Sequence, residues 1–278
     1  MKVLYLGTGA SEGIPALFCN CDYCKRVRRG GGKMRSRAQV LLDGELSIDF
    51  PPDSFYHQAA FGVDLSAVRY LLVTHAHMDH FNAENFVMRG YKYALNMTQC
   101  YLDIYANAEV LKVFRQDTQR EIRREVKNPI SLHKLTAFHK AAFGDWQVFP
   151  LKAKHNSKSP LLYLIEKDGK RILHLTDTGL LPEEDYVFLK TLGGGAVDLI
   201  TFDCTFLWED VSISGRHMGL KENMQVLHRL EEIGLADAHT KKVVTHFSHY
   251  NQPTEENLKR AEEECGVIAA YDGLEIEI

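Results

Sequence analysis

One short stretch of the sequence places four metal-binding side chains directly after an apolar run. The run Tyr70 to Val73 is rich in strand-forming residues and is followed at once by His75, His77, Asp79 and His80. Side chains alternate along a strand, so His75 and His77 point the same way. The chain then turns, and Asp79 and His80 can face a second point nearby. Imidazole and carboxylate ligands without a thiolate favour zinc, manganese or iron, and the stretch can serve two such ions.

Three more ligand-type side chains follow predicted strands later in the chain. His155 comes after the strand 146–151, Asp177 after the strand 171–175, and His246 after the strand 242–245. Each repeats the first arrangement, in which an apolar strand ends in a polar residue. His174, by contrast, alternates with apolar residues inside its strand, so we expect it to be packed there.

A separate group of thiols lies near the N-terminus. Cys19, Cys21 and Cys24 fall within six residues, a spacing that suits one tetrahedral zinc with a fourth ligand from elsewhere. The alternative is three free thiols. The spacing is awkward for disulfides, so it indicates a reducing compartment and predicts a cytoplasmic protein.

The composition bounds the classes of protein to consider. The chain has 278 residues, of which 45% are hydrophobic and 25% charged, an ordinary balance for a soluble globular protein. Its net charge of −4 gives no basic footprint for nucleic acid. No apolar run approaches the ~20 residues that span a membrane. No repeat or linker divides the sequence, so residues 1–278 are predicted to form one α/β domain without a membrane or nucleic-acid partner.

The predicted elements alternate between strands and helices. Hairpins are expected over 38–49 and 161–175, strands over 2–6, 100–105, 198–203 and 274–278, and helices over 53–61, 183–192, 220–233 and after Thr254. The basic, glycine-rich stretch 25–37 is either a mobile loop near an anionic substrate or a solvated loop. The segment 83–135 is a lid or a subunit contact, a choice the sequence leaves open. His133 and His139 are expected in an irregular stretch and are taken as surface residues.

Asp49 has two possible roles. It lies at a predicted strand end before Pro51 and Pro52, where its carboxylate can fix the tautomer of a metal-bound histidine. It can equally cap the helix that begins near Asp53.

The complete ordered set of ligands resembles the metallo-β-lactamase superfamily over nearly the whole chain. The resemblance rests on Thr-His-x-His-x-Asp-His at 74–80, followed by a distant His, Asp and His. It implies an α/β fold of the αββα sandwich type with two divalent metal ions. One ion would be held by His75, His77 and His155, the other by Asp79, His80 and His246, and Asp177 would bridge them.

A narrower resemblance points to the PhnP phosphodiesterases. Cys19, Cys21 and Cys24, with His249 placed three residues after His246, look like the structural zinc site of that family. Further matches, in order, are Gly7-Thr-Gly9, Gly13-Ile-Pro15, Asp203-Cys204 and the loop histidine His217. One departure is Asp49-Phe50-Pro51, where relatives commonly have Asp-x-Gly.

This narrower resemblance implies hydrolysis of small cyclic phosphodiesters, of the ribosyl 1,2-cyclic phosphate or 2′,3′-cyclic nucleotide type. It also implies a homodimer and an active-site pair of Mn²⁺ or Zn²⁺, with iron and nickel as other candidates. Two such ions can lower the pKa of a water toward ~7. Asp79, as a ligand, and His217, as the acid that protonates the leaving oxygen, are the catalytic candidates.

Three other functions stay open. A thioester or other acyl hydrolase could use the same metal site without an acid at His217. A transfer-RNA 3′ processing nuclease shares the first motif, although the sequence shows no long basic arm to grip RNA. Some cysteine-zinc relatives in cofactor biosynthesis have degraded sites, but here all seven metal positions are intact.

Overall fold

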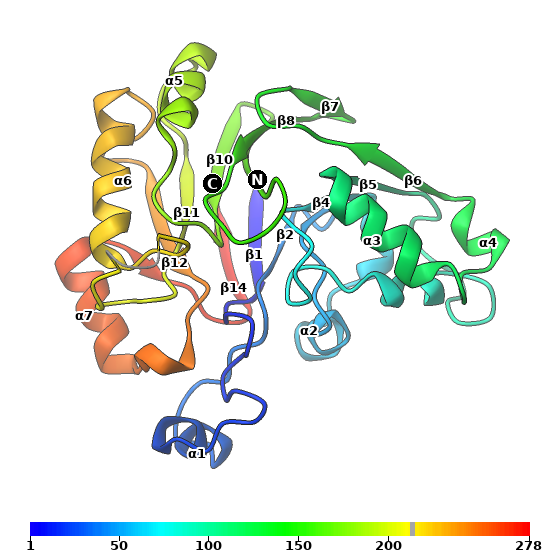
Figure 1. Ribbon diagram of the computed structural model, residues 1–278, viewed down its shortest axis with the longest axis horizontal. Coiled ribbons are helices and arrows are strands. Elements are labelled where there is room, and N and C mark those ends of the chain that lie inside the picture. Colours follow the sequence, from blue (N-terminus) through cyan, green and yellow to red (C-terminus); the bar gives the residue numbers. More distant parts are fainter. Residues whose placement is uncertain (212–214) are drawn as a thin grey trace.

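Two seven-stranded sheets form the centre of the molecule, shown by a computed structural model that describes residues 1–211 and 215–278 (Figure 1). The first sheet contains, in spatial order, β14 (Leu274–Glu277), β1 (Lys2–Gly7), β2 (Gln39–Leu42), β3 (Leu46–Ile48), β4 (Tyr70–Val73), β5 (Leu102–Ala106) and β6 (Ile130–Lys134). The second contains β13 (Ile268–Ala269), β12 (Lys241–Thr245), β11 (Leu199–Asp203), β10 (Lys170–Leu175), β9 (Leu161–Lys167), β8 (Trp146–Lys152) and β7 (Ala141–Phe143).

Helices cover the outer faces of the sheets. The α-helices are α1 (Asp22–Arg28), α2 (Ser54–Phe61), α3 (Ala108–Thr118), α4 (Arg124–Lys127), α5 (Glu183–Leu192), α6 (Leu220–Glu232) and α7 (Glu255–Cys265), with short 3₁₀ turns η1 (Leu65–Ala67), η2 (Ala83–Met88) and η3 (His249–Asn251). α5, α6 and α7 lie on one side of the molecule and α2 and α3 on the other (Figure 1). The order of layers is helix, sheet, sheet, helix, as the resemblance implied.

Three apolar clusters hold these layers together. The middle one joins the inner faces of the two sheets through residues such as Leu72 of β4 and Ile172 of β10. The outer clusters bury Leu230 of α6 against the second sheet and Phe114 of α3 against the first. Removing such side chains from water is the main force that stabilises this arrangement.

Two buried tyrosines also connect the sheets by hydrogen bonds. Tyr5 Oη of β1 lies 2.6 Å from Thr201 Oγ1 of β11. Tyr163 of β9 donates to the carbonyl of Val73, the last residue of β4, at 2.6 Å. The end of the strand that delivers the first ligands is therefore tied to the opposite sheet.

Strand direction explains why the predicted ligands can meet. β3 to β6 pair in parallel, as do β10 to β13. β8 runs the same way as β10 because each is antiparallel to β9. The carboxyl ends of β4, β8, β10 and β12 carry the predicted ligands, and in open α/β sheets such ends are the usual place for binding sites.

Most predicted elements are confirmed, with shifts of one or two residues at their ends. The helix over 183–192 and both hairpins form as expected, and Thr254 caps α7 through the Asn257 amide. The strand expected over 100–105 is β5, Leu102–Ala106. No helix in the described ranges is long and apolar enough to cross a membrane.

Two local predictions are wrong. The stretch 25–37 is not all loop, because α1 extends to Arg28 and is capped by Cys21, whose side chain accepts from the Cys24 amide. His133 is not in an irregular segment: it lies in β6 and its Nε2 is 2.9 Å from Asp103 Oδ1. Both elements are short and polar, and their order comes from neighbouring segments that sequence periodicity does not reveal.

Candidate metal centre

Seven side chains predicted as metal ligands form two adjoining groups. The ligand atoms within each group all lie within 4.8 Å of one another. The first group is His75, His77, His155 and Asp177, and the second is Asp79, His80, Asp177 and His246. The division is the one that the sequence resemblance implied, with Asp177 common to both groups.

Asp177 lies at the centre of the cluster. Its Oδ2 is 3.1 Å from both His75 Nε2 and His80 Nε2, and its Oδ1 is 3.3 Å from His155 Nδ1. It lies two residues after the end of β10, and its side chain is 2% exposed. One carboxylate can thus contact histidines from both groups, as a bridging ligand would.

The donor atoms fit metal ions. Three buried histidine nitrogens, Nε2 of His75, His80 and His246, have no hydrogen-bond partner among the described residues. A buried polar atom without a partner is costly, and a cation bound by these nitrogens would remove that cost. Imidazoles and carboxylates suit zinc, manganese or iron.

Asp49 is a buried acceptor beside the ligands. Its carboxylate lies 2.7 Å from His80 Nδ1 and accepts hydrogen bonds from both the amide and the hydroxyl of Thr74 at 2.8–3.0 Å. The helix α2 begins at Ser54, with Asp53 at its N-cap position. The structure thus places Asp49 against a ligand histidine and not at the helix.

Three residues of the centre have left-handed backbone conformations. The φ angles of Asp49, Asp177 and His246 are 62°, 62° and 63°. Each such conformation costs a non-glycine residue about 1–3 kcal/mol, and such residues gather at functional sites. Each of the three lies one or two residues after a strand, and the sharp turn there lets its side chain point in a direction that the strand alone would not allow.

His217 faces the same cluster from the loop before α6. Its Nδ1 lies 2.9 Å from Asp177 Oδ1 and 3.0 Å from Asp203 Oδ2. Burial alone would lower the pKa of His217, but Asp203 and Asp177 raise it to about 10. In the metal-free protein His217 is therefore an imidazolium held by two carboxylates.

Burial and neighbouring charges also set the ionisation of the ligands. Burial lowers the pKa of His75, and it lowers that of His155 to about 4. Burial alone would raise the pKa of Asp79, but His80 and His246 lower it well below its usual range. Neutral His75 and His155 with ionised Asp79 are the forms that bind cations.

Two side chains here have no role predicted from the sequence: Asp203, which enters only through the Asp203-Cys204 match, and Thr205. Asp203 ends β11 and contacts His217, and Thr205 Oγ1 lies 2.8 Å from His246 Nδ1. Asp203 is a polar residue at the end of an apolar strand, the same signal that identified Asp177. Thr205 carries no signal of its own, because threonine is common in loops.

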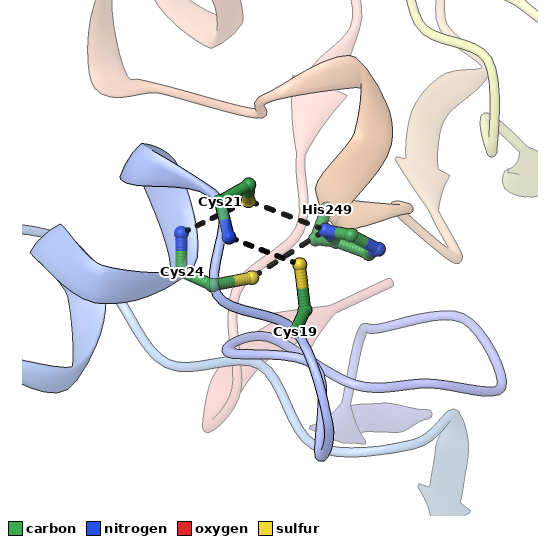
Figure 2. Close-up of side chains that lie close together, drawn as sticks. All are labelled: Cys19, Cys21, Cys24 and His249. Atoms are coloured by element: carbon green, nitrogen blue, oxygen red, sulfur yellow. Dashed lines mark hydrogen bonds between the residues drawn. The ribbon is translucent and has the colours of Figure 1, made fainter.

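Near the N-terminus, Cys19, Cys21 and Cys24 meet His249 (Figure 2). The His249 Nδ1 atom is 3.4 Å from Cys24 Sγ and 3.8 Å from Cys21 Sγ. A tetrahedral zinc with bonds of ~2.3 Å to sulfur and ~2.0 Å to nitrogen requires such S···N separations to be about 3.5 Å. The four donors fit one zinc ion, and the structure brings together the residues that the resemblance assigned to it.

A cavity of about 470 Å³ opens onto the histidine and aspartate cluster. His217 lines it together with ligands of both groups. The side chains that belong to neither group include Ser11, Glu12, Met78, Asn156 and Arg216. A small substrate could reach both metal positions and His217 at once.

Curated relatives match the full length of the chain. Coenzyme PQQ synthesis protein B of Methylorubrum extorquens is 26% identical over 305 residues, covering 100% of both chains. An octanoyltransferase of Porphyromonas gingivalis is 26% identical over 289 residues, covering 99% of this chain and 51% of the relative. The chain thus spans about half the length of that relative.

Solved structures share the fold. A diphosphatase from the PhnP family superposes with a TM-score of 0.73 at 20% identity, covering 100% of this chain and 98% of that one. Zinc-bound PqqB from Methylobacterium extorquens superposes with a TM-score of 0.77 at 16% identity, with 100% of both chains covered. The family model described as beta-lactamase superfamily domain matches residues 40–247, a range that includes all seven predicted ligands. The chain therefore belongs to the metallo-β-lactamase superfamily.

Proposed function

We propose that the chain is a binuclear metal-dependent phosphodiesterase for small cyclic phosphodiesters, of the ribosyl 1,2-cyclic phosphate or 2′,3′-cyclic nucleotide type. The position of His217 carries the proposal. It lines the same cavity as both ligand groups, and two carboxylates hold its Nδ1. A fixed proton donor beside a site for two cations suits the hydrolysis of a diester with a poor leaving group.

The ligand groups would hold two divalent ions, manganese or zinc with iron and nickel as other candidates, while the cysteine group would hold a structural zinc. The bound pair would supply Lewis-acid contacts to phosphate oxygens and lower the pKa of a water toward ~7. Asp79 and Asp177 would neutralise only part of the four positive charges. The centre would therefore attract an anionic diester.

His217 would act on the leaving group. Because Nδ1 faces Asp177 and Asp203, Nε2 is the nitrogen left to donate a proton. In the hydrolysis, the hydroxyl of water joins phosphorus and the P–O bond to the leaving alcohol breaks. The leaving oxygen takes the proton from His217, which regains one from solvent.

The relatives support parts of this proposal. A member of the PhnP family with the same fold is described as a diphosphatase, which favours chemistry at phosphorus. The name coenzyme PQQ synthesis protein B gives a pathway rather than a reaction, so that likeness is compatible with several activities.

A second candidate is hydrolysis of an acyl ester or thioester. The name of the octanoyltransferase relative favours it. Hydrolysis of a thioester would not need His217, since the thiol that leaves is a better leaving group than an alcohol. A transfer-RNA 3′ nuclease is a further candidate, because the short form of human tRNase Z shares the fold, but the net charge of −4 gives no basic footprint for RNA. A mobility-shift assay with transfer RNA would reveal it.

The test is turnover by metal-replete protein on a panel of four substrates: a ribose cyclic phosphate, a 2′,3′-cyclic nucleotide, an aryl phosphodiester and a thioester. We expect cleavage of the diesters alone, lost in Asp79→Ala. Thioester cleavage with inert diesters would overturn the proposal.

A further inference from the structure

Glu12 places a carboxylate in the wall of the metal-centre cavity. Asp79, Asp177 and Glu12 are the acidic side chains that line this cavity in the described chain. Asp79 and Asp177 belong to the ligand groups, whereas Glu12 belongs to none of them. Glu12 is therefore not itself a ligand, although its Oε1 lies 3.9 Å from Nε2 of His249 in the cysteine group.

Hydrogen bonds hold this carboxylate in place. Its Oε1 accepts from the Ser248 hydroxyl at 2.6 Å and from the His249 amide at 3.3 Å. Ser248 and His249 follow the ligand His246, and His249 is itself in the cysteine group. Glu12 is thus fixed to the segment that connects the two kinds of metal site.

The turn that carries Glu12 is also anchored. The Ala10 amide donates to the carbonyl of Phe247 at 3.0 Å, and Arg37 Nε donates to the carbonyl of Ser11 at 2.9 Å. A third bond, from the Gly13 amide to the Ala10 carbonyl at 2.9 Å, closes the turn. A side chain on such a turn loses little further entropy when it contacts a ligand.

The other carboxylate oxygen is available. Oε2 of Glu12 takes part in no hydrogen bond within 1–211 and 215–278, and no lysine or arginine there pairs with the side chain. The side chain is 34% exposed. Glu12 therefore offers an acceptor with negative charge to whatever occupies the cavity.

The cavity sets this anion beside Arg216 and the His217 imidazolium, whose Nδ1 is already held by the carboxylates of Asp177 and Asp203. Arg216 is the sole lysine or arginine in its described lining. A carboxylate accepts hydrogen bonds and cannot donate them, so it favours hydroxyl groups and repels phosphate. Arg216 and two metal positions suit the single charge of a diester, while Glu12 opposes a second phosphate.

We propose that Glu12 determines specificity by accepting hydrogen bonds from sugar hydroxyl groups of the substrate. The preferred substrate is then a monoanionic phosphodiester of a hydroxylated sugar, and a sugar that bears an additional phosphate is disfavoured. This inference rests on the proposed phosphodiesterase function and adds a substrate class to it.

The experiment compares wild type with Glu12→Gln on three diesters. These are ribose 1,2-cyclic phosphate, the same compound phosphorylated at the 5-hydroxyl, and bis(4-nitrophenyl) phosphate, which has no hydroxyl. Wild type should favour the first over the second in kcat/KM. Glu12→Gln should reduce that preference about tenfold, mainly through KM. It should leave kcat/KM for the aryl diester within about threefold of the wild-type value.

Controls separate local from general effects. Glu256→Gln removes the same charge from the exposed surface of α7 and should leave the preference unchanged. Elemental analysis should find equal metal content in all three proteins, since Glu12 is not a ligand.

Three outcomes would overturn the inference. An unchanged preference in Glu12→Gln would refute it and leave the phosphodiesterase proposal standing. An equal loss on all three diesters would show that Glu12 only supports the fold. If wild type cleaves none of the diesters, the proposed function falls and the inference falls with it.

Discussion

His80 Nδ1 lies 2.7 Å from Asp49 Oδ2, and both side chains are almost completely buried. Since Nδ1 is occupied by Asp49, only Nε2 of His80 faces the metal centre. A carboxylate in this position fixes the tautomer of a metal-binding histidine and increases its basicity. Asp49 also holds Thr74, the residue before the first ligand, so it positions the ligand strand as well.

We predict that Asp49→Asn weakens metal binding at the histidine and aspartate centre by about 10–100-fold. The amide keeps an acceptor for Thr74 but removes the negative charge beside His80. Competition with a chromophoric chelator would measure the affinity. Asp145→Asn, an exposed change in the turn between β7 and β8, is the control, and an unchanged affinity in Asp49→Asn would contradict the assigned role.

We predict that His217→Ala affects diesters according to their leaving groups. A proton donor contributes about 10²–10⁴-fold when the leaving oxygen is an alkoxide. A nitrophenolate leaves without that help, so His217→Ala should slow the cleavage of a nitrophenyl diester much less. The measurement is kcat for a cyclic nucleotide and for an aryl diester; equal losses on both would remove the acid role from His217.

We predict that Cys24→Ser lowers the zinc content by one ion per chain and lowers the thermal midpoint. Cys24 is completely buried and lies beside His249, and structural zinc sites add directly to folding stability. Elemental analysis and thermal unfolding test both effects. Cys265→Ser in α7 is the control because Cys265 lies outside the zinc group; an equal zinc content in Cys24→Ser would refute the site.

We predict a pH dependence of stability from Asp185 in α5. Burial raises its pKa to about 7, and its Oδ2 has no hydrogen-bond partner among the residues that are described. The folded state therefore holds a proton that the unfolded state releases near pH 4. The stabilisation is full below about pH 4 and is lost as the pH rises to about 7.

Asp185→Asn should remove this loss. Between pH 4.5 and 7.5 the wild-type free energy of unfolding should fall, relative to the variant, by about 1–4 kcal/mol. Urea unfolding at both values, with the same metal content, would measure the difference. A constant difference between the two proteins would show that Asp185 is ionised throughout.

The strand-end pattern made much of the centre predictable. Asp177 and His246 each follow a short apolar strand, and an apolar run followed by a polar residue can be recognised in the sequence alone. The contact of Asp49 with His80 could not be assigned, because it depends on parallel pairing of β3 with β4 and on the turn after each strand. Glu12 could not be found at all, since an acidic residue in a polar turn gives no sign of the Ser248 hydroxyl that holds it.

The most direct test of the account starts from protein whose histidine and aspartate centre has been emptied while its cysteine site retains zinc. Metal is then added back while cleavage of a 2′,3′-cyclic nucleotide is followed. Asp177 is shared by two ligand groups, so we predict that activity rises until two equivalents of Mn²⁺ or Zn²⁺ are bound and that Asp177→Ala abolishes it. Full activity at one equivalent, or no cleavage at any metal content, would contradict a binuclear phosphodiesterase.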